Sequence, residues 1–227
     1  LFRMGRIYEA ELRDLEQAEA TYRAILEADS EDEMAVVALE DLFRSARMFD
    51  KLVDQLLERA AEAESPAERR EALLEAATVY ETDLGDYGKA LAVVLGVLKE
   101  NTADDAMYVR IERLGVLAEA WPAILEEVGA LLGATQDPTA VVKLCTHLGT
   151  WSHEHLGRPD FALRYFQQAL QIDPQSENAM EGVERIYRSA KQWVELVQVL
   201  ERRAEVAAFP TIRRDRRAEA AAIHEER

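Results

Sequence analysis

Three histidines and the single cysteine of the chain lie close together and could bind a metal ion. They are Cys145, His147, His153 and His155, and thiolate and imidazole groups are ligands that zinc prefers. On a helix, His153 and His155 lie about 200° apart and His147 and His153 about 240° apart. Neither of these pairs therefore shares a helix face, as the i, i+4 pairs of helical zinc sites do. We predict no metal site and no cofactor, and expect imidazoles in the core or along a groove.

Glutamate and aspartate are abundant, but no pattern arranges them for catalysis. Acid–base chemistry needs a carboxylate near a positioned base or nucleophile, and phosphate transfer needs a glycine-rich loop; the sequence shows neither. We therefore predict no catalytic residue and no enzyme activity. Glu40, Glu112 and Glu184 do recur at a constant interval. Pairing to an arginine or to a helix cap is favoured for them over a functional role.

The elements that carry these residues belong to a repeat with the same 72-residue interval. Aromatic, proline and apolar positions recur in register, which is the signature of a solenoid whose units cover one another's apolar faces. We expect the aromatic positions to pack between helices rather than to form a ligand platform. The matching sets are Phe49, Trp121 and Trp193; Pro66, Pro138 and Pro210; Ala18, Ala90 and Ala162; and Leu26, Leu98 and Leu170.

Each repeat contains four predicted helices, and the whole chain about thirteen. Ala, Leu, Glu and Arg dominate the composition, which favours helices over strands. Each repeated proline suits a first helical turn, and the preceding Ser65 or Asp137 can cap free N–H groups. The helices predicted for the third copy cover about residues 138–156, 158–171, 176–190 and 192–207.

One hairpin of the third copy resembles the tetratricopeptide repeat. The resemblance rests on Leu148-Gly149, Leu156-Gly157, Ala162, Phe166, Ala169-Leu170 and Asp173-Pro174. In that family a small residue lets two antiparallel helices approach and an aromatic residue fills the gap. The other hairpin of each unit departs from the pattern, since Glu40 and Leu52 stand at small-residue positions, so its helices should pack farther apart. The resemblance implies an all-α fold, a right-handed α-solenoid of stacked antiparallel helical hairpins.

The predicted domain organisation is a single solenoid over residues 1–227. Its units cover approximately residues 1–65, 66–137, 138–209 and a partial 210–227. Both ends fall inside predicted helices and lack the polar capping helix that solenoids use. We expect the chain to be a piece of a longer array.

Charge and hydropathy narrow the range of partners. The net charge of −17 repels phosphate backbones, so we expect no nucleic-acid partner. No apolar stretch approaches the roughly 18 residues of a spanning helix, so we expect no membrane insertion. A single cysteine is compatible with a reducing compartment, and we expect a cytoplasmic protein.

The tetratricopeptide resemblance implies a non-enzymatic scaffold that binds protein or peptide partners along its concave surface. We expect such a scaffold to work inside a larger bacterial assembly. Two alternatives stay open: a self-associating element that stacks through its ends, and an accessory array for an enzyme domain outside this segment. The residues predicted to contact a partner are Arg44, Val109, Arg113, Val116, Lys143, His153, Arg185 and Arg188.

Overall fold

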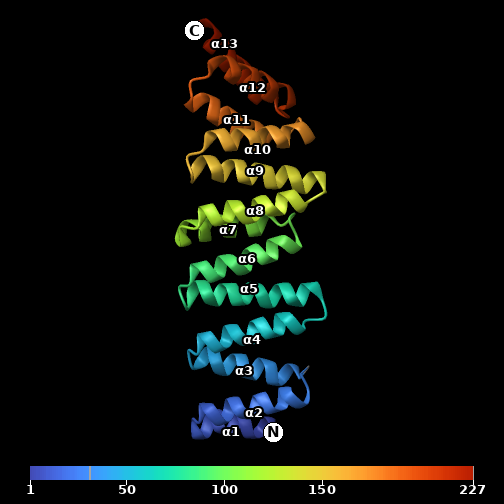
Figure 1. Ribbon diagram of the computed structural model, residues 1–227, viewed down its shortest axis with the longest axis vertical. Helices are drawn as coiled ribbons and strands as arrows, with labels where there is room; N and C mark the ends of the chain where they lie inside the picture. Colours follow the sequence, from blue (N-terminus) through green and yellow to red (C-terminus); the bar gives the residue numbers. More distant parts are fainter. Residues whose placement is uncertain (31, 227) are drawn as a thin grey trace. The chain divides into compact units, whose positions relative to one another are not determined.

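The computed structural model describes residues 1–30 and 32–226 (Figure 1). Within these ranges it contains thirteen α-helices, one π-helical turn and no strand, which confirms the predicted all-α helical repeat fold. The elements are α1 (Phe2–Ile7), the π-helical turn (Tyr8–Leu12), α2 (Leu15–Ala28), α3 (Glu33–Ser45), α4 (Phe49–Glu62), α5 (Pro66–Thr82), α6 (Tyr87–Glu100), α7 (Asp105–Ala118), α8 (Trp121–Ala134), α9 (Pro138–Glu154), α10 (Pro159–Ile172), α11 (Glu177–Ser189), α12 (Trp193–Val206) and α13 (Pro210–Glu226).

The helices repeat with the interval seen in the sequence. Helices α2, α6 and α10 begin at equivalent positions of successive copies, as do α4, α8 and α12, and α5, α9 and α13. The repeated prolines are the first residues of α5, α9 and α13, as predicted. Before them, Ser65 and Glu68 form a reciprocal capping box, and Asp137 accepts a hydrogen bond of 2.8 Å from the Ala140 N–H. These caps satisfy amide groups that the first helical turn leaves without partners.

The turns inside the hairpins also recur in register. Arg13, Gly85 and Gly157 adopt the left-handed backbone conformation in one turn, each at the equivalent position of its copy. The second turn uses non-glycine residues in the same conformation, and these are Arg47, Glu119 and Lys191. A side chain at such a position strains the backbone, because its Cβ approaches the carbonyl oxygen. The backbone conformation of each turn therefore recurs in every copy, although the residue type at the position changes.

The chain divides into two compact units, residues 1–97 and residues 98 onward. Within each unit, consecutive helices run antiparallel and lie against one another (Figure 1). The first unit has a core between α2, α3, α4 and α5. In the second unit, one apolar cluster joins α9, α10 and α11, and another joins α12 and α13. Fully buried side chains in the two units include Tyr22, Leu39, Phe43, Leu56, Trp151 and Phe166.

Two hairpins are held tightly by a glycine beneath an aromatic ring. A Cβ atom built on Gly149 would lie 2.6 Å from Cε1 of Phe166, and one on Gly5 would lie 2.5 Å from Cε1 of Tyr22. Such distances are too short for a real contact, so only glycine fits at this separation. The resemblance to tetratricopeptide hairpins predicted this close approach in the third copy.

The aromatic position that recurs in each copy opens α4, α8 and α12. Trp121 is buried and lies against Trp151, with 5.9 Å between ring centroids. Phe49 packs against the core of the first unit and Trp193 against the cluster of α12 and α13. The prediction that these residues pack between helices is confirmed.

Candidate binding surface

Helices α7, α9 and α11 form one continuous surface in the second unit, here called the odd-helix face. Lys143 of α9 forms an ion pair of 2.8 Å with Asp105 of α7. Glu154, the last residue of α9, forms an ion pair with Arg185 of α11. Because each of these contacts joins alternate helices, the first helices of successive hairpins lie side by side, as the family resemblance implied.

Two valines of α7 are exposed on this part of the chain. Val109 is 68 % exposed and Val116 is 54 % exposed. They lie two turns apart on one side of the helix. The first copy has Val37 and Arg44 at these positions, and the third copy has Glu181 and Arg188. Only the middle copy is therefore apolar at both positions.

A buried glutamate lies beneath the equivalent surface of the first copy. Glu40 of α3 is only 5 % exposed, and both its carboxylate oxygens accept hydrogen bonds from Nη1 of Arg59 on α4. Arg59 also forms an ion pair of 2.8 Å with Glu75 of α5, which in turn contacts Arg44 at 2.5 Å. Burial raises the pKa of Glu40 even though the Arg59 charge opposes the change. The network joins three helices.

The third copy has a related network built from the equivalent residues, with some contacts changed. Glu184 of α11 is bonded to Arg203 of α12 and, at 2.7 Å, to Arg188. Arg188 also forms an ion pair of 2.6 Å with Glu219 of α13. The prediction that Glu40 and Glu184 pair with arginine is confirmed. In these two hairpins an arginine of the second helix thus pairs with a glutamate of the first.

The middle copy keeps the glutamate but changes its surroundings. Where the other copies supply arginines and a glutamate, this one has Val116, Leu131 and His147. Glu112 instead lies near His155, with 3.9 Å between Oε1 and Nε2. Among the described contacts, Glu112 therefore faces an imidazole, whereas Glu40 and Glu184 face arginines.

Aromatic and histidine rings pack against one another in the middle copy. The His147 ring stacks on Tyr108 with 4.0 Å between centroids, and the His155 ring stacks on Trp121 at 3.7 Å. Trp151 lies between the two stacks, 6.2 Å from Tyr108 and 5.9 Å from Trp121. Burial lowers the pKa of His147 to about 4, so this imidazole is neutral at pH 7. The expectation of a core or groove imidazole is confirmed for His147.

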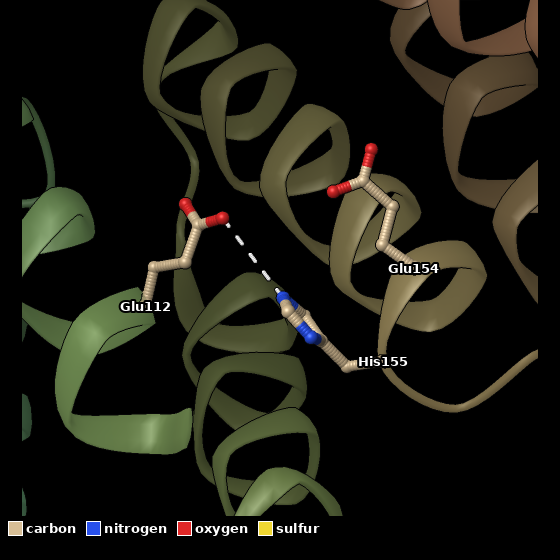
Figure 2. A group of neighbouring side chains, drawn as sticks. All are labelled: Glu112, Glu154 and His155. Carbon is tan, nitrogen blue, oxygen red and sulfur yellow. Dashed lines mark ion pairs between the residues drawn. The ribbon is translucent and has the colours of Figure 1, made fainter. Parts of the chain in front are cut away.

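Glu112, Glu154 and His155 converge on a shared space (Figure 2). The nearest donor atoms of the three side chains all lie within 4.8 Å of one another. Glu112 comes from α7, and the other two come from the end of α9. The helical spacing of His147, His153 and His155 did not predict this group, because the side chains that face the His155 imidazole are carboxylates.

The eight residues predicted to contact a partner all lie on odd-numbered helices. Seven belong to the second unit, and Arg44 belongs to the first. Val109, Arg113, Val116, Arg185 and Arg188 are exposed, whereas Lys143 and His153 are half-buried. The charges of Arg44, Lys143, Arg185 and Arg188 are offset by ion pairs within the chain. The two valines are the most exposed apolar groups of the set.

Comparisons with known proteins agree with the repeat architecture. The family model described as tetratricopeptide repeat matches residues 144–180, and a second model with the same description matches residues 1–31. Together these segments cover less than a third of the chain. The chain is a tetratricopeptide-like helical repeat protein.

Solved structures of low sequence identity resemble the chain. A crystal structure of MamA is 15 % identical and has a TM-score of 0.43, over 83 % of this chain and 95 % of that one. YrrB, described as a tetratricopeptide protein with an unusual peptide-binding site, is 15 % identical, with a TM-score of 0.45 over 86 % and 96 %. A tetratricopeptide repeat protein from Parabacteroides merdae is 14 % identical, with a TM-score of 0.38 over 99 % and 91 %. A search of the curated proteins found no match.

Across the part of the chain that the structure describes, no helix combines the length and the apolar character needed to span a membrane.

Proposed function

We propose that the chain is a non-enzymatic scaffold within a larger assembly, and that the odd-helix face binds an extended peptide segment of a protein partner. The observation that carries this proposal is the pair of exposed valines on α7, Val109 and Val116. Burial of such side chains contributes about 1.5–3 kcal/mol each when a partner covers them fully. A helix face that is apolar at both positions, where each sister copy carries at least one charge, is therefore suited to binding.

The partner follows from the spacing and the charges of this surface. Two helical turns separate the valines by about 10.5 Å along the helix, which a peptide in the extended polyproline II conformation spans in about three residues, with side chains three residues apart on one face. A peptide lying along α7 would thus present apolar side chains in an apolar-x-x-apolar pattern. The nearby Lys143 and Asp105 charges offset one another, so apolar contacts rather than net charge should select the ligand.

A displayed library of random twelve-residue peptides would test the proposal. Selected peptides are synthesised and titrated against the wild type, Val109→Asp and Val116→Asp by calorimetry. Val194→Asp is the matched control, because Val194 is 69 % exposed but lies on α12, outside the odd-helix face. We expect selected peptides with the apolar spacing, and at least tenfold weaker binding to the two α7 variants only. Failure to enrich any peptide, or an equal loss with Val194→Asp, would contradict the proposal.

Self-association is a second candidate function, favoured by the apolar surface of α1. Leu1, Met4 and Ile7 are all exposed there, and a second molecule could cover them. Light scattering over a dilution series would detect such association, and Met4→Glu should abolish it. A mass that stays monomeric at every concentration would exclude this candidate and leave the scaffold proposal standing.

A further inference from the structure

We propose that Glu112, Glu154 and His155 form a binding site for a single divalent transition-metal ion of the zinc class. The three side chains approach one another from α7 and from the end of α9 (Figure 2). Two carboxylates and a neutral imidazole carry a formal charge of −2, which matches a divalent cation. Glu112 lies between Val109 and Val116 on the same side of α7, but metal binding by these three side chains does not require a bound peptide.

The unusual position of Glu112 is the first argument for the site. Its counterparts Glu40 and Glu184 are neutralised by Arg59 and Arg203, but the middle copy has Leu131 at that place. The 3.9 Å between Oε1 of Glu112 and Nε2 of His155 is too long for a hydrogen bond. A tetrahedral ion with ligand bonds of about 2.0 Å would hold the same two atoms about 3.3 Å apart. A small side-chain rotation therefore completes the contact.

The free nitrogen of His155 is the second, independent argument. Its Nε2 atom is buried and has no hydrogen-bond partner among the described residues. Buried polar atoms without a partner are rare in native proteins and usually mark a missing ligand or water. The stack of the His155 ring on Trp121, with planes 4° apart, holds the ring with Nε2 toward the two carboxylates (Figure 2). The imidazole is thus positioned to bind an ion before the ion arrives.

The donor set selects the type of ion. Imidazole suits zinc, nickel, copper and iron, whereas sites for magnesium and calcium are built from oxygen atoms. Three protein ligands leave one position of a tetrahedral zinc ion for water. Bound in this way, the ion would tie α7 to α9 in the copy that lacks the arginine network.

Arg185 competes with the ion for one ligand. Its Nη1 atom is bonded to Oε1 of Glu154, which leaves the second carboxylate oxygen for the metal. Replacing this cation with a neutral amide keeps all three donors and removes a repulsive charge. Arg185→Gln should therefore bind the ion at least as tightly as the wild type.

Metal titration of the full chain tests the site. After treatment with a chelator, the protein is titrated with Zn²⁺, and separately with Mg²⁺ and Ca²⁺, by calorimetry and by tryptophan fluorescence. We expect one Zn²⁺ per chain, a rise in Tm and a change in emission from Trp121 beside His155. Glu112→Gln, Glu154→Gln and His155→Gln should each weaken binding at least tenfold, while the control His224→Gln and Arg185→Gln should not. Circular dichroism would show whether each variant is folded.

Several outcomes would overturn the proposal. Binding without a defined stoichiometry, or an equal affinity in His155→Gln and the wild type, would show surface adsorption by the many carboxylates. Equal responses to Mg²⁺ and Zn²⁺ would show that the imidazole is not a ligand. If two of the three ligand variants are folded and still bind Zn²⁺ as the wild type does, the assignment of these residues as metal ligands is wrong.

Discussion

Nη1 of Arg59 donates hydrogen bonds of 2.7 and 2.9 Å to the two carboxylate oxygens of Glu40. The glutamate is buried, whereas the arginine reaches from the next helix and is partly exposed. A charge in this position is stable only while its partner remains, because the surrounding helices offer it little water. Loss of the arginine is therefore more harmful than loss of both groups together.

Replacing Arg59 with methionine should destabilise the fold by about 3 kcal/mol, because Glu40 would be left buried without its main counter-charge. Chemical denaturation followed by circular dichroism measures this loss. The double variant Glu40→Met, Arg59→Met should recover most of the stability. Burial already raises the pKa of Glu40, so the deficit of the single variant should shrink as the pH is lowered and the carboxyl group takes up a proton.

Arg23→Met is the control for this cycle. Arg23 forms an ion pair with Glu19 on the same helix, and its side chain is 43 % exposed. Surface pairs of this kind contribute less than about 1 kcal/mol. A loss at Arg59 no larger than the loss at Arg23 would show that the Glu40 network is not important for stability.

Alanine at Gly149 should destabilise the chain by about 1–3 kcal/mol, because its Cβ would overlap the Phe166 ring. The second copy suggests a rescue, since it has Ala77 and Val94 at the equivalent positions, both fully buried. The double variant Gly149→Ala, Phe166→Val should therefore lose less stability than the sum of the losses in the two single variants. Thermal and chemical unfolding of the four variants give the coupling energy.

Gly129→Ala is the matched control for overlap, because no atom lies within 4 Å of the Cβ that it would add. Replacing this helical glycine with alanine should stabilise the fold by up to about 1 kcal/mol. Similar effects at Gly129 and Gly149 would mean that the ring contact does not limit the hairpin.

The two left-handed turns predict substitutions with opposite effects. Gly157 has a φ of 60° and open space around it, so Gly157→Ala should cost about 1 kcal/mol through backbone strain alone. Glu119 has a φ of 51°, and Glu119→Gly should be neutral or stabilising by up to about 1 kcal/mol. Equal signs for the two changes, measured by denaturation, would contradict the explanation from backbone conformation.

Acid should destabilise the second unit through His147. Its pKa is about 4 in the fold and 6.5 as an isolated group, so the unfolded chain binds more protons between these values. Stability is therefore lost as the pH falls from about 6.5 toward about 4, and it is fully present above that window. Between pH 7 and about pH 5 the loss from this group should approach about 2 kcal/mol.

His147→Phe isolates this contribution, because phenylalanine can still stack on Tyr108 and cannot titrate. As the pH is lowered, the free energy of unfolding of the variant should rise relative to that of the wild type. A difference that does not change with pH would show that His147 is not buried in its neutral form.

The local signals in the sequence predicted the helices well. Pro138 and the capping Asp137 marked the start of α9, and the repeat interval carried this assignment to the other copies. The resemblance to the tetratricopeptide repeat implied the contact between Gly149 and Phe166. These features depend on neighbouring residues or on one helix pair, so local patterns are enough to find them.

The group around His155 could not be found in this way. Its contact with Glu112 joins α7 and α9 and depends on side-chain rotamers, whereas helix periodicity compares residues on one helix only. A signal did exist in the sequence: Arg59 and Arg203 match across copies, while Leu131 stands between them. Comparing the copies for lost partners, rather than for shared residues, would have pointed to Glu112.

The Glu40 network sets limits on how such a chain can be shortened by recombination. A deletion of residues 49–120 would fuse α3 to α8 and place Leu131 opposite Glu40. The buried carboxylate would then lack its arginine counter-charge. A deletion of residues 76–147 has the same length, yet it retains Arg59 and Glu75 and still yields a helix that begins at Pro66. Crossover points inside the first helix of a hairpin should therefore be tolerated, whereas those in the turn between α3 and α4 should not.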